Sequence, residues 1–311
     1  MSGLNPDGAA AQSHTPPTTH PTPPSPPFVH VAGADNFRDA GGYALDGQPG
    51  KAIRRGVVFR SAHLTDLEDD GVATLQRLGV THVFDLRSFP EIDKEGRSRA
   101  WEGATSQLLP VFLGKDYRPE ALAVRFRHYS DGPEGFVKAY SGILSTAAEP
   151  DHPYAPYHKI LEHLASPTNP PTPLLVHCSA GKDRTGVIIA LILSLCGLSD
   201  DAVAAEYSLT DRGLARRKEA IVQRLIGEDA PLCGQRARAE MMVGAAKENM
   251  LGTLALIRQQ YGSVESYVVD HLGVSQAKVD QLRRNLVVDL AEGEEALDWR
   301  RHAGSKEEPR L

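Results

Sequence analysis

The sequence of 311 residues is poor in cysteine: it has three, none in a Cys-x-x-Cys pair and none clustered with histidine. This scarcity argues against a disulfide framework and against a structural zinc site. Basic residues are not in excess either, because 34 Lys and Arg stand against 40 Asp and Glu, a net charge of −6. A nucleic-acid-binding protein usually carries a basic excess, so nucleic acid is not an expected partner.

Long hydrophobic runs are also missing. The longest mostly apolar run, residues 187–196, is too short to cross a bilayer and predicts a buried helix. The N-terminus lacks a basic segment followed by an apolar core, so we expect no signal peptide. Hydrophobic residues still make up 41% of the chain, which is enough for a sizeable core. We therefore expect a cytoplasmic protein with no stable membrane insertion.

The composition divides the chain into three parts. Residues 1–27 are rich in proline and nearly uncharged, which predicts a disordered tail because such a segment cannot bury a core. The Pro-x-x-Pro spacing of Pro21 and Pro24 would suit an SH3-type groove, but the composition favours a plain linker. Residues 28–290 are predicted to form one domain, and residues 291–311 a charged C-terminal tail.

Periodicity and capping residues predict the elements of this domain. The expected strands span residues 57–61, 82–86 and 174–176. The expected helices span residues 64–78, 135–144, 158–164, 199–212, 216–226, 236–260 and 275–290. Strands that alternate with helices predict an α/β fold, with a mostly parallel central sheet flanked by helices and an additional helical C-terminal part. A ligand would then bind at the carboxyl ends of the strands.

One stretch, residues 174–186, leads from an apolar strand through a short loop into an apolar helix. Its sequence is Leu-Leu-Val-His-Cys-Ser-Ala-Gly-Lys-Asp-Arg-Thr-Gly, with Arg184 six positions after Cys178. The other two cysteines have Ala202 and Ala239 at that distance. A loop that enters a helix N-terminus points backbone N–H groups and the positive end of the helix dipole inward. Such a loop binds phosphate and favours the thiolate form of a cysteine at its base.

Each residue type in the loop suits a step of phosphate chemistry. The thiolate of Cys178 can attack phosphorus and form a phosphocysteine, which splits hydrolysis into two easier steps. The planar fork of Arg184 can grip two phosphate oxygens, and Thr185 can donate its hydroxyl to the sulfur. Gly181 and Gly186 suit a tight turn and a close approach of the ligand. The predicted phosphate-binding residues are Ser179, Ala180, Gly181, Lys182, Asp183, Arg184 and Thr185. His177 is expected to form structural hydrogen bonds behind the loop.

The same residues carry a resemblance to a known family. The loop resembles the signature of cysteine-dependent tyrosine and dual-specificity phosphatases, in the version typical of the protein tyrosine/serine phosphatases of bacteria and fungi. The segments 36–39, 60–61, 85–88 and 261–267 resemble other motifs of that family, so the likeness spans about residues 28–290. It implies a tyrosine-phosphatase-like fold, no metal or other cofactor, and a phosphorylated protein or a phosphoinositide as substrate.

In the resembled family, helices inserted after the catalytic helix form a lid over the site. Residues 215–250 would be this segment here, with ordinary packing as the alternative. Asp39, Asp85 and Arg87 are expected to brace the strand ends, and Arg38 and Arg60 are candidates for the same role.

Phosphate monoester hydrolysis also needs a general acid to protonate the leaving oxygen. The resembled family takes it from a loop that corresponds to residues 108–117 here, but its aspartate stands nearer the Leu-Pro element, where this chain has no carboxylate. Asp116 is the predicted acid, and Asp183, inside the loop, is the alternative.

The substrate remains open between protein and lipid. Lys182 brings a second cation to the loop, which would suit a substrate with more than one phosphate, although an ion pair with Asp183 is the alternative. Two other function classes compete with a phosphatase: a phosphate-binding module without turnover, and a sulfurtransferase that carries persulfide on Cys178. The intact Cys-x5-Arg-Thr pattern favours the phosphatase.

Overall fold

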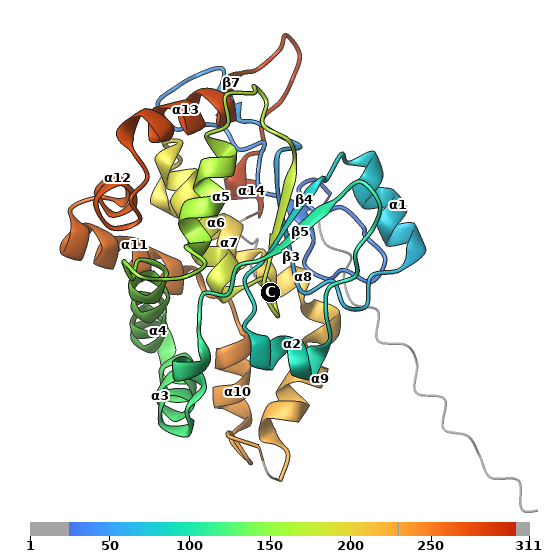
Figure 1. Ribbon diagram of the computed structural model, residues 1–311, viewed down its shortest axis with the longest axis vertical. Helices are drawn as coiled ribbons and strands as arrows, with labels where there is room; N and C mark the ends of the chain where they lie inside the picture. Colours follow the sequence, from blue (N-terminus) through green and yellow to red (C-terminus); the bar gives the residue numbers. More distant parts are fainter. Residues whose placement is uncertain (1–24, 229, 303–311) are drawn as a thin grey trace, which may run out of the picture.

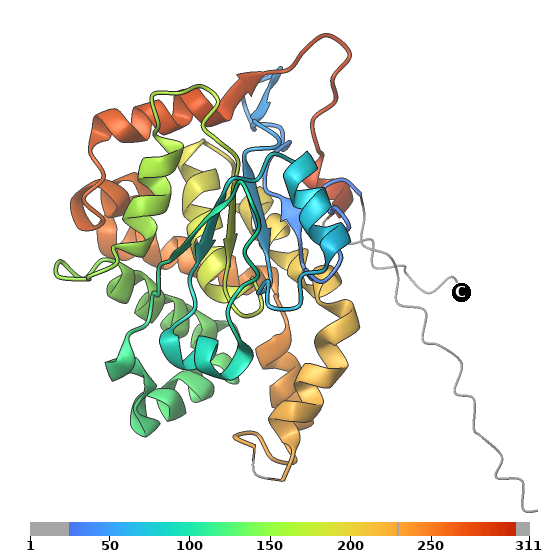
Figure 2. The same ribbon diagram turned by 45° about the vertical axis from the view of Figure 1, so that its right-hand side comes forward.

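The computed structural model describes residues 25–228 and 230–302, shown in two views in Figures 1 and 2. A five-stranded sheet crosses its centre in the order β1-β3-β6-β4-β5. The strands are β1 (Arg38–Asp39), β3 (Val58–Ser61), β6 (Leu174–His177), β4 (His82–Asp85) and β5 (Thr105–Leu108). Only β1 runs antiparallel to its neighbour. The predicted mostly parallel α/β sheet is confirmed.

The two faces of the sheet are buried against layers of unequal size. Leu175 of β6, Phe59 of β3 and Val83 of β4 pack into a small core on the side of α1 (Asp69–Arg77). The alternate strand residues, such as Val176 and Phe84, point into a much larger core on the opposite face, because successive strand side chains alternate between faces. The helices of this larger layer are α4 (Gly132–Ala147), α5 (Pro156–Leu164), α6 (Asp183–Leu195), α7 (Asp200–Ser208), α11 (Lys247–Tyr261) and α13 (Gln276–Leu286). Figure 1 shows α1 on one side of the sheet and α5, α6 and α7 on the other.

Shorter elements surround the end of the sheet where the parallel strands finish. These are α2 (Phe89–Glu95), the 3₁₀ turn η1 (Gly114–Tyr117), α3 (Pro119–Tyr129), α8 (Thr210–Gly213), α9 (Ala215–Ile226) and α10 (Arg236–Val243). Both views show α2, α9 and α10 gathered beyond that end, at the bottom of the molecule. Because β3, β4 and β6 are paired in register at Ser61, Asp85 and His177, the loops that follow them meet there.

Several predicted helices are broken or shorter than periodicity indicated. The helix predicted for residues 64–78 begins only at Asp69, because the hydroxyl of Thr65 donates to the carbonyl of Gly96 instead of capping a helix. The helix predicted for residues 199–212 divides into α7 and α8. The helix predicted for residues 236–260 divides at Gly244 into α10 and α11, where the Ala245 amide donates to the Asp211 carboxylate.

The C-terminal part of the chain also differs from the prediction. The helix predicted for residues 275–290 ends at Leu286, and the following β7 (Val287–Asp289) pairs with β2 (Lys51–Ile53) in a two-stranded antiparallel sheet. Valine at positions 287 and 288 favours the strand. Beyond the predicted domain end at residue 290, Leu297 is buried and its amide donates to the Gly42 carbonyl. The segment predicted as a charged C-terminal tail, residues 291–311, therefore packs on the domain at Leu297 and includes α14 (Trp299–His302).

The remaining helical elements are α12 (Val264–Ser266) and the π-helical turn η2 (Tyr267–His271). Among the described residues, no helix combines the length and the apolar character needed to cross a bilayer. The Pro-rich segment at residues 1–24, with its predicted linker or SH3-ligand role, lies outside the described residues.

Candidate active site

The loop after β6 is shaped to hold an anion. Gly181 has φ +62°, and a Cβ atom there would lie 2.0 Å from the Ser61 carbonyl oxygen, so no other residue fits. None of the backbone amides from Ser179 to Lys182 donates a hydrogen bond within residues 25–228 and 230–302. Cys178 is buried at the base of this loop, and α6 begins directly after it. Free amides at a helix N-terminus are the arrangement that binds anions in other proteins, and the assignment of phosphate binding to this loop stays a prediction.

The carbonyl side of the loop is held from behind by β1 and β3. The Asn36 side-chain amide donates to the Ala180 and Gly181 carbonyls at 3.1 and 3.2 Å, and Arg60 Nη2 donates to Gly181 at 2.7 Å. With its outward carbonyls satisfied in this way, the loop can keep its amides turned inward.

Glu206 of α7 orients both arginines of this wall. Its carboxylate accepts from Arg38 Nε at 2.7 Å and from Arg60 Nη1 at 2.6 Å, and all three side chains are almost completely buried. Burial alone would raise the pKa of Glu206, but the two guanidinium charges hold it below its ordinary value. Sequence analysis gave the arginines a bracing role and missed Glu206. The one available signal was an acid within an otherwise apolar stretch of α7, residues 202–207.

His177 has the structural role that was expected. It is fully buried; its Nε2 lies 3.1 Å from Ser98 Oγ and its Nδ1 lies 3.3 Å from the Cys178 carbonyl. Asp85 and Arg87, paired at 2.8 Å, complete the cluster beneath β4 and β6. Burial lowers the pKa of His177, which favours the neutral imidazole.

Arg184 lies in the first turn of α6 and forms a two-pronged ion pair with Glu91 of α2. Nη1 and Nη2 each lie 2.6 Å from one carboxylate oxygen. Glu91 also accepts from the hydroxyls of Ser179 at 2.8 Å and Tyr117 at 2.7 Å. Burial would raise the pKa of Glu91, but the Arg184 charge and hydrogen bonds hold it far below its ordinary value. Sequence analysis missed this glutamate, although Ser88 and Glu91 form a capping box that marks the start of α2.

The two predicted acids lie on different sides of the loop. Asp116, half-buried in η1, accepts from the Leu113 amide at 2.8 Å, and its neighbour Tyr117 contacts Glu91, so η1 borders the site. Asp183 accepts from the Tyr140 hydroxyl at 2.8 Å. The choice of Asp116 stays a prediction.

Lys182 turns its side chain toward the helices beyond the loop. Its buried ammonium group donates to the carbonyls of Met242 at 2.5 Å and Gly244 at 3.0 Å, at the end of α10. The alternative contact with Asp183 is also present, at 3.5 Å. In this arrangement the cation fastens the loop to the α9–α10 segment. Thr185 is buried, and its hydroxyl has no hydrogen bond within the described residues, so the predicted bond to the sulfur is not formed.

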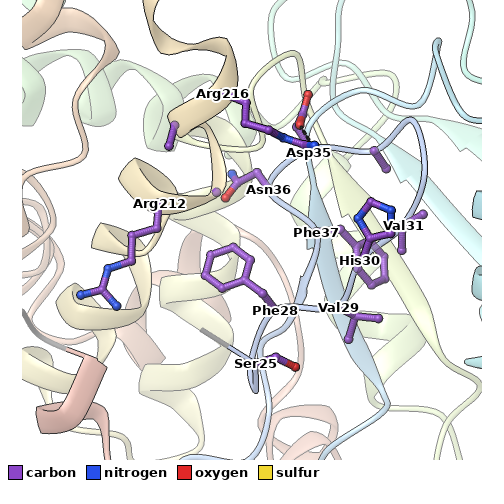
Figure 3. A pocket seen from close by; sticks show the side chains of 13 residues that line it. Ser25, Phe28, Val29, His30, Val31, Asp35, Asn36, Phe37, Arg212 and Arg216 are labelled. Carbon is purple, nitrogen blue, oxygen red and sulfur yellow. Dashed lines mark hydrogen bonds and ion pairs between the residues drawn. The ribbon is translucent and has the colours of Figure 1, made fainter. Parts of the chain in front are cut away.

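Two cavities border this region. One of about 160 Å³ lies between the loop and the α9–α10 segment; its lining is mainly apolar and comprises Tyr129, Ala180, Lys182, Asp183, Leu214, Ile221, Leu225, Met242 and Val243. The other, of about 390 Å³, is shown in Figure 3 with Phe28, Asn36 and Arg212 around it. Asn36 connects this second cavity to the loop, but neither Cys178 nor Arg184 lines it.

Comparison with known proteins agrees with this geometry. Residues 29–288 match the model of the tyrosine phosphatase family. The chain is 34% identical over 277 residues to the triple specificity protein phosphatase PtpB of Mycobacterium tuberculosis, covering 81% of this chain and 96% of that protein. It is 26% identical to a putative tyrosine-protein phosphatase of Cupriavidus necator (78% and 84% covered) and to a tyrosine-protein phosphatase of Nostoc commune (92% and 95%). The chain therefore belongs to the tyrosine phosphatase family, and its activity is that of a cysteine-dependent phosphatase.

Proposed function

We propose that Cys178 is the nucleophile and Arg184 the phosphate clamp of a two-step hydrolysis. The thiolate of Cys178 attacks phosphorus, the P–O bond to the leaving group breaks, and a proton from the general acid reaches the departing oxygen. Water then gives a proton to the deprotonated acid and attacks the phosphocysteine, the S–P bond breaks to restore the thiolate, and inorganic phosphate leaves. The observation that supports these roles is the set of free loop amides above Cys178, next to the guanidinium of Arg184.

We assign the general acid to Asp116, as predicted, because η1 borders the clamp through Tyr117. The role of this residue is testable with leaving groups of different basicity. Asp116→Asn should slow the hydrolysis of phenyl phosphate by about 10²-fold and that of an activated nitrophenyl ester much less, since a good leaving group needs no proton. Asp183→Asn serves as the comparison, and a larger leaving-group effect in that variant would transfer the role to Asp183.

We propose phosphotyrosine as the main substrate, with phosphoserine and phosphothreonine as further ones, in a cytoplasmic setting. The mainly apolar cavity of about 160 Å³ beside the loop suits an aryl group. Phosphoinositide use, the second candidate, needs a free cation near the loop, and Lys182 is already bonded to two carbonyls. Rates on a phosphotyrosine peptide, a phosphoserine peptide and a phosphoinositide distinguish these substrates.

The mechanism is tested by hydrolysis of a generic aryl phosphate with and without chelator. Cys178→Ser should abolish turnover, whereas Cys196→Ser should preserve it, because burial raises the pKa of Cys196 to about 12 and keeps that thiol protonated. Turnover that survives Cys178→Ser, or that needs a divalent ion, contradicts the mechanism. Phosphopeptide binding without turnover would point to a binding module, and thiosulfate turnover to a sulfurtransferase.

A further inference from the structure

The cavity of about 390 Å³ in Figure 3, which we call the Phe28 cavity, has a lining separate from the catalytic pair. Phe28, Val31 and Phe37 supply buried apolar walls. The helices α8 and α9 contribute Arg212 and Arg216 to the lining. Small-molecule sites usually have volumes of about 300–1,000 Å³ and combine apolar walls with a few polar or charged groups. The Phe28 cavity has both properties.

The charges around the Phe28 cavity favour an anion. Asp35 is the one carboxylate among the described residues of the lining, and it is paired with Arg216 at 3.4 Å and with Arg217 at 3.6 Å. Arg212 is exposed and forms no hydrogen bond or ion pair within residues 25–228 and 230–302. Its guanidinium is therefore available to a ligand. A carboxylate suits this planar fork, because its two oxygens can accept two parallel N–H bonds.

The apolar and the charged parts of the lining are separated in space. Figure 3 shows Arg212 and Arg216 on the helical side of the cavity and Val31 and Phe37 on the opposite side, with the Phe28 ring between them. A cation would meet the two arginines, and a purely apolar molecule would leave the Arg212 guanidinium unused. A molecule with an anionic head and an apolar body matches this division of the lining.

We propose that the Phe28 cavity binds a small amphipathic carboxylate, with the carboxylate on Arg212 and the apolar chain against Phe28 and Phe37. Burial of the apolar chain supplies most of the affinity, and the ion pair fixes the orientation of the ligand. This binding is an activity in addition to the hydrolysis proposed above. It does not depend on that hydrolysis, because neither Cys178 nor Arg184 lines the cavity.

Asn36 is a direct contact between the Phe28 cavity and the phosphate loop. It lines the cavity, its backbone amide donates to the Gly213 carbonyl at 3.1 Å, and its side chain donates to the Ala180 and Gly181 carbonyls. Its φ of +59° is uncommon for a residue other than glycine, so the surrounding contacts hold it in this conformation. A carboxylate in the cavity can therefore change the affinity of the loop for phosphate, but only up to a limit that is reached when the cavity is filled.

Calorimetric titration of the full chain with decanoate, below the concentration at which it forms micelles, tests the site. We expect saturable one-to-one binding to wild type and binding about tenfold weaker to Arg212→Gln, because a hydrogen-bonded ion pair is lost. Arg224→Gln is the matched control, since Arg224 is an exposed arginine of α9 that does not line the cavity. It should bind decanoate as wild type does. Equal weakening in both variants would reveal general attraction to a basic surface and would overturn the proposal.

A variant that fills the cavity tests the place of the apolar chain. Ala215, at the start of α9, is half-buried and lines the cavity, so Ala215→Phe should remove decanoate binding. Unchanged binding in a folded Ala215→Phe would overturn the proposal. If that variant folds poorly, the surface substitution Arg212→Gln still decides the matter. Absence of saturable binding to the wild-type chain would also overturn it, whether the cavity is empty or filled by other residues of the chain.

Kinetics distinguish the Phe28 cavity from the catalytic site. Any change that decanoate causes in the KM for an aryl phosphate should level off as the cavity fills. A KM that rises in proportion to decanoate without limit would place the ligand in the catalytic site and would overturn the proposal. Cys178→Ser should bind decanoate as tightly as wild type although its turnover is lost. Turnover retained by Cys178→Ser would defeat the proposed function alone, whereas absence of decanoate binding would defeat only the present inference.

Discussion

Two glutamate–arginine clusters contact the phosphate loop and differ in what surrounds them. The inner cluster, Glu206 with Arg38 and Arg60, is closed from solvent, with side chains 0–1% exposed. The outer pair, Glu91 with Arg184, is 11–18% exposed and borders the mouth of the loop. The inner cluster contacts the loop at the Gly181 carbonyl, and the outer pair at the Ser179 hydroxyl.

A glutamate paired with arginine serves a different purpose in each of these two positions. A carbonyl that faces away from the ligand needs a permanent donor, and Arg60 supplies it under the control of Glu206. A donor that must reach a ligand needs N–H groups that are not already used, and Arg184 contacts Glu91 through Nη1 and Nη2 only. Substitutions in the inner cluster should therefore lower the free energy of unfolding, and substitutions in the outer pair should lower kcat.

The largest effect is expected for Glu206→Ala. Two buried guanidinium groups would lose their shared counter-charge, which typically costs about 3–5 kcal/mol of unfolding free energy. Urea denaturation measures this loss, and Glu91→Gln, measured in parallel, should cost less, because its pair is 11–18% exposed and the glutamine oxygen can still accept hydrogen bonds. Equal losses in the two variants would break the distinction between the clusters.

Arg184→Ala should give the opposite profile. Loss of a preoriented donor to the transition state typically lowers kcat about 10²- to 10³-fold, or roughly 3–4 kcal/mol. The urea midpoint should move much less than in Glu206→Ala, since the released Glu91 can reach water. Aryl phosphate kinetics and denaturation on one preparation test this, and a fall in stability as large as that of Glu206→Ala would count against the distinction.

Asn36→Ala would sharpen the comparison at an intermediate level. It removes two hydrogen bonds to the Ala180 and Gly181 carbonyls and the side-chain oxygen that accepts from Arg38, and we expect a loss of about 1–3 kcal/mol of stability. It should also weaken phosphate binding more than Glu206→Ala does, because Asn36 contacts the loop directly. Phosphate inhibition constants measure the loss of binding, and urea midpoints measure the loss of stability. Unchanged phosphate binding in Asn36→Ala would show that Arg60 alone is enough to hold the loop.

The smallest effect is expected in the pH dependence of stability. The folded pKa values of Glu206 and Glu91 are below their ordinary values, so each contributes stability that is complete above the unfolded pKa of about 4.3. That contribution is lost as the pH falls from there toward the folded pKa. Thermal melting from pH 6 to pH 3 should therefore fall less steeply in Glu206→Gln than in wild type. If the melting temperatures of Glu206→Gln and wild type fell equally with pH, other carboxylates would be responsible for the loss of stability in acid.

The sequence was sufficient to predict the loop and the sheet because their signals are local. An apolar strand, Cys178, Arg184 and an apolar helix occupy one short stretch, and the parallel arrangement follows from the alternation of strands and helices. Glu206 and Glu91 escaped prediction because their arginine partners are far away in the chain, more than 80 residues in each case. The break at Gly244 escaped for the same reason, since Lys182 and Asp211 bind the backbone around it.

The two strands of the small sheet, β2 and β7, are made at very different times during synthesis of the chain. During synthesis, β2 leaves the ribosome long before the strand that completes its sheet, Val287–Asp289, has been made. Pairings between such distant segments form late and slowly, because a long loop must close first. The nascent chain therefore carries an unpaired strand edge until β7 has been made, and such an edge is prone to aggregation.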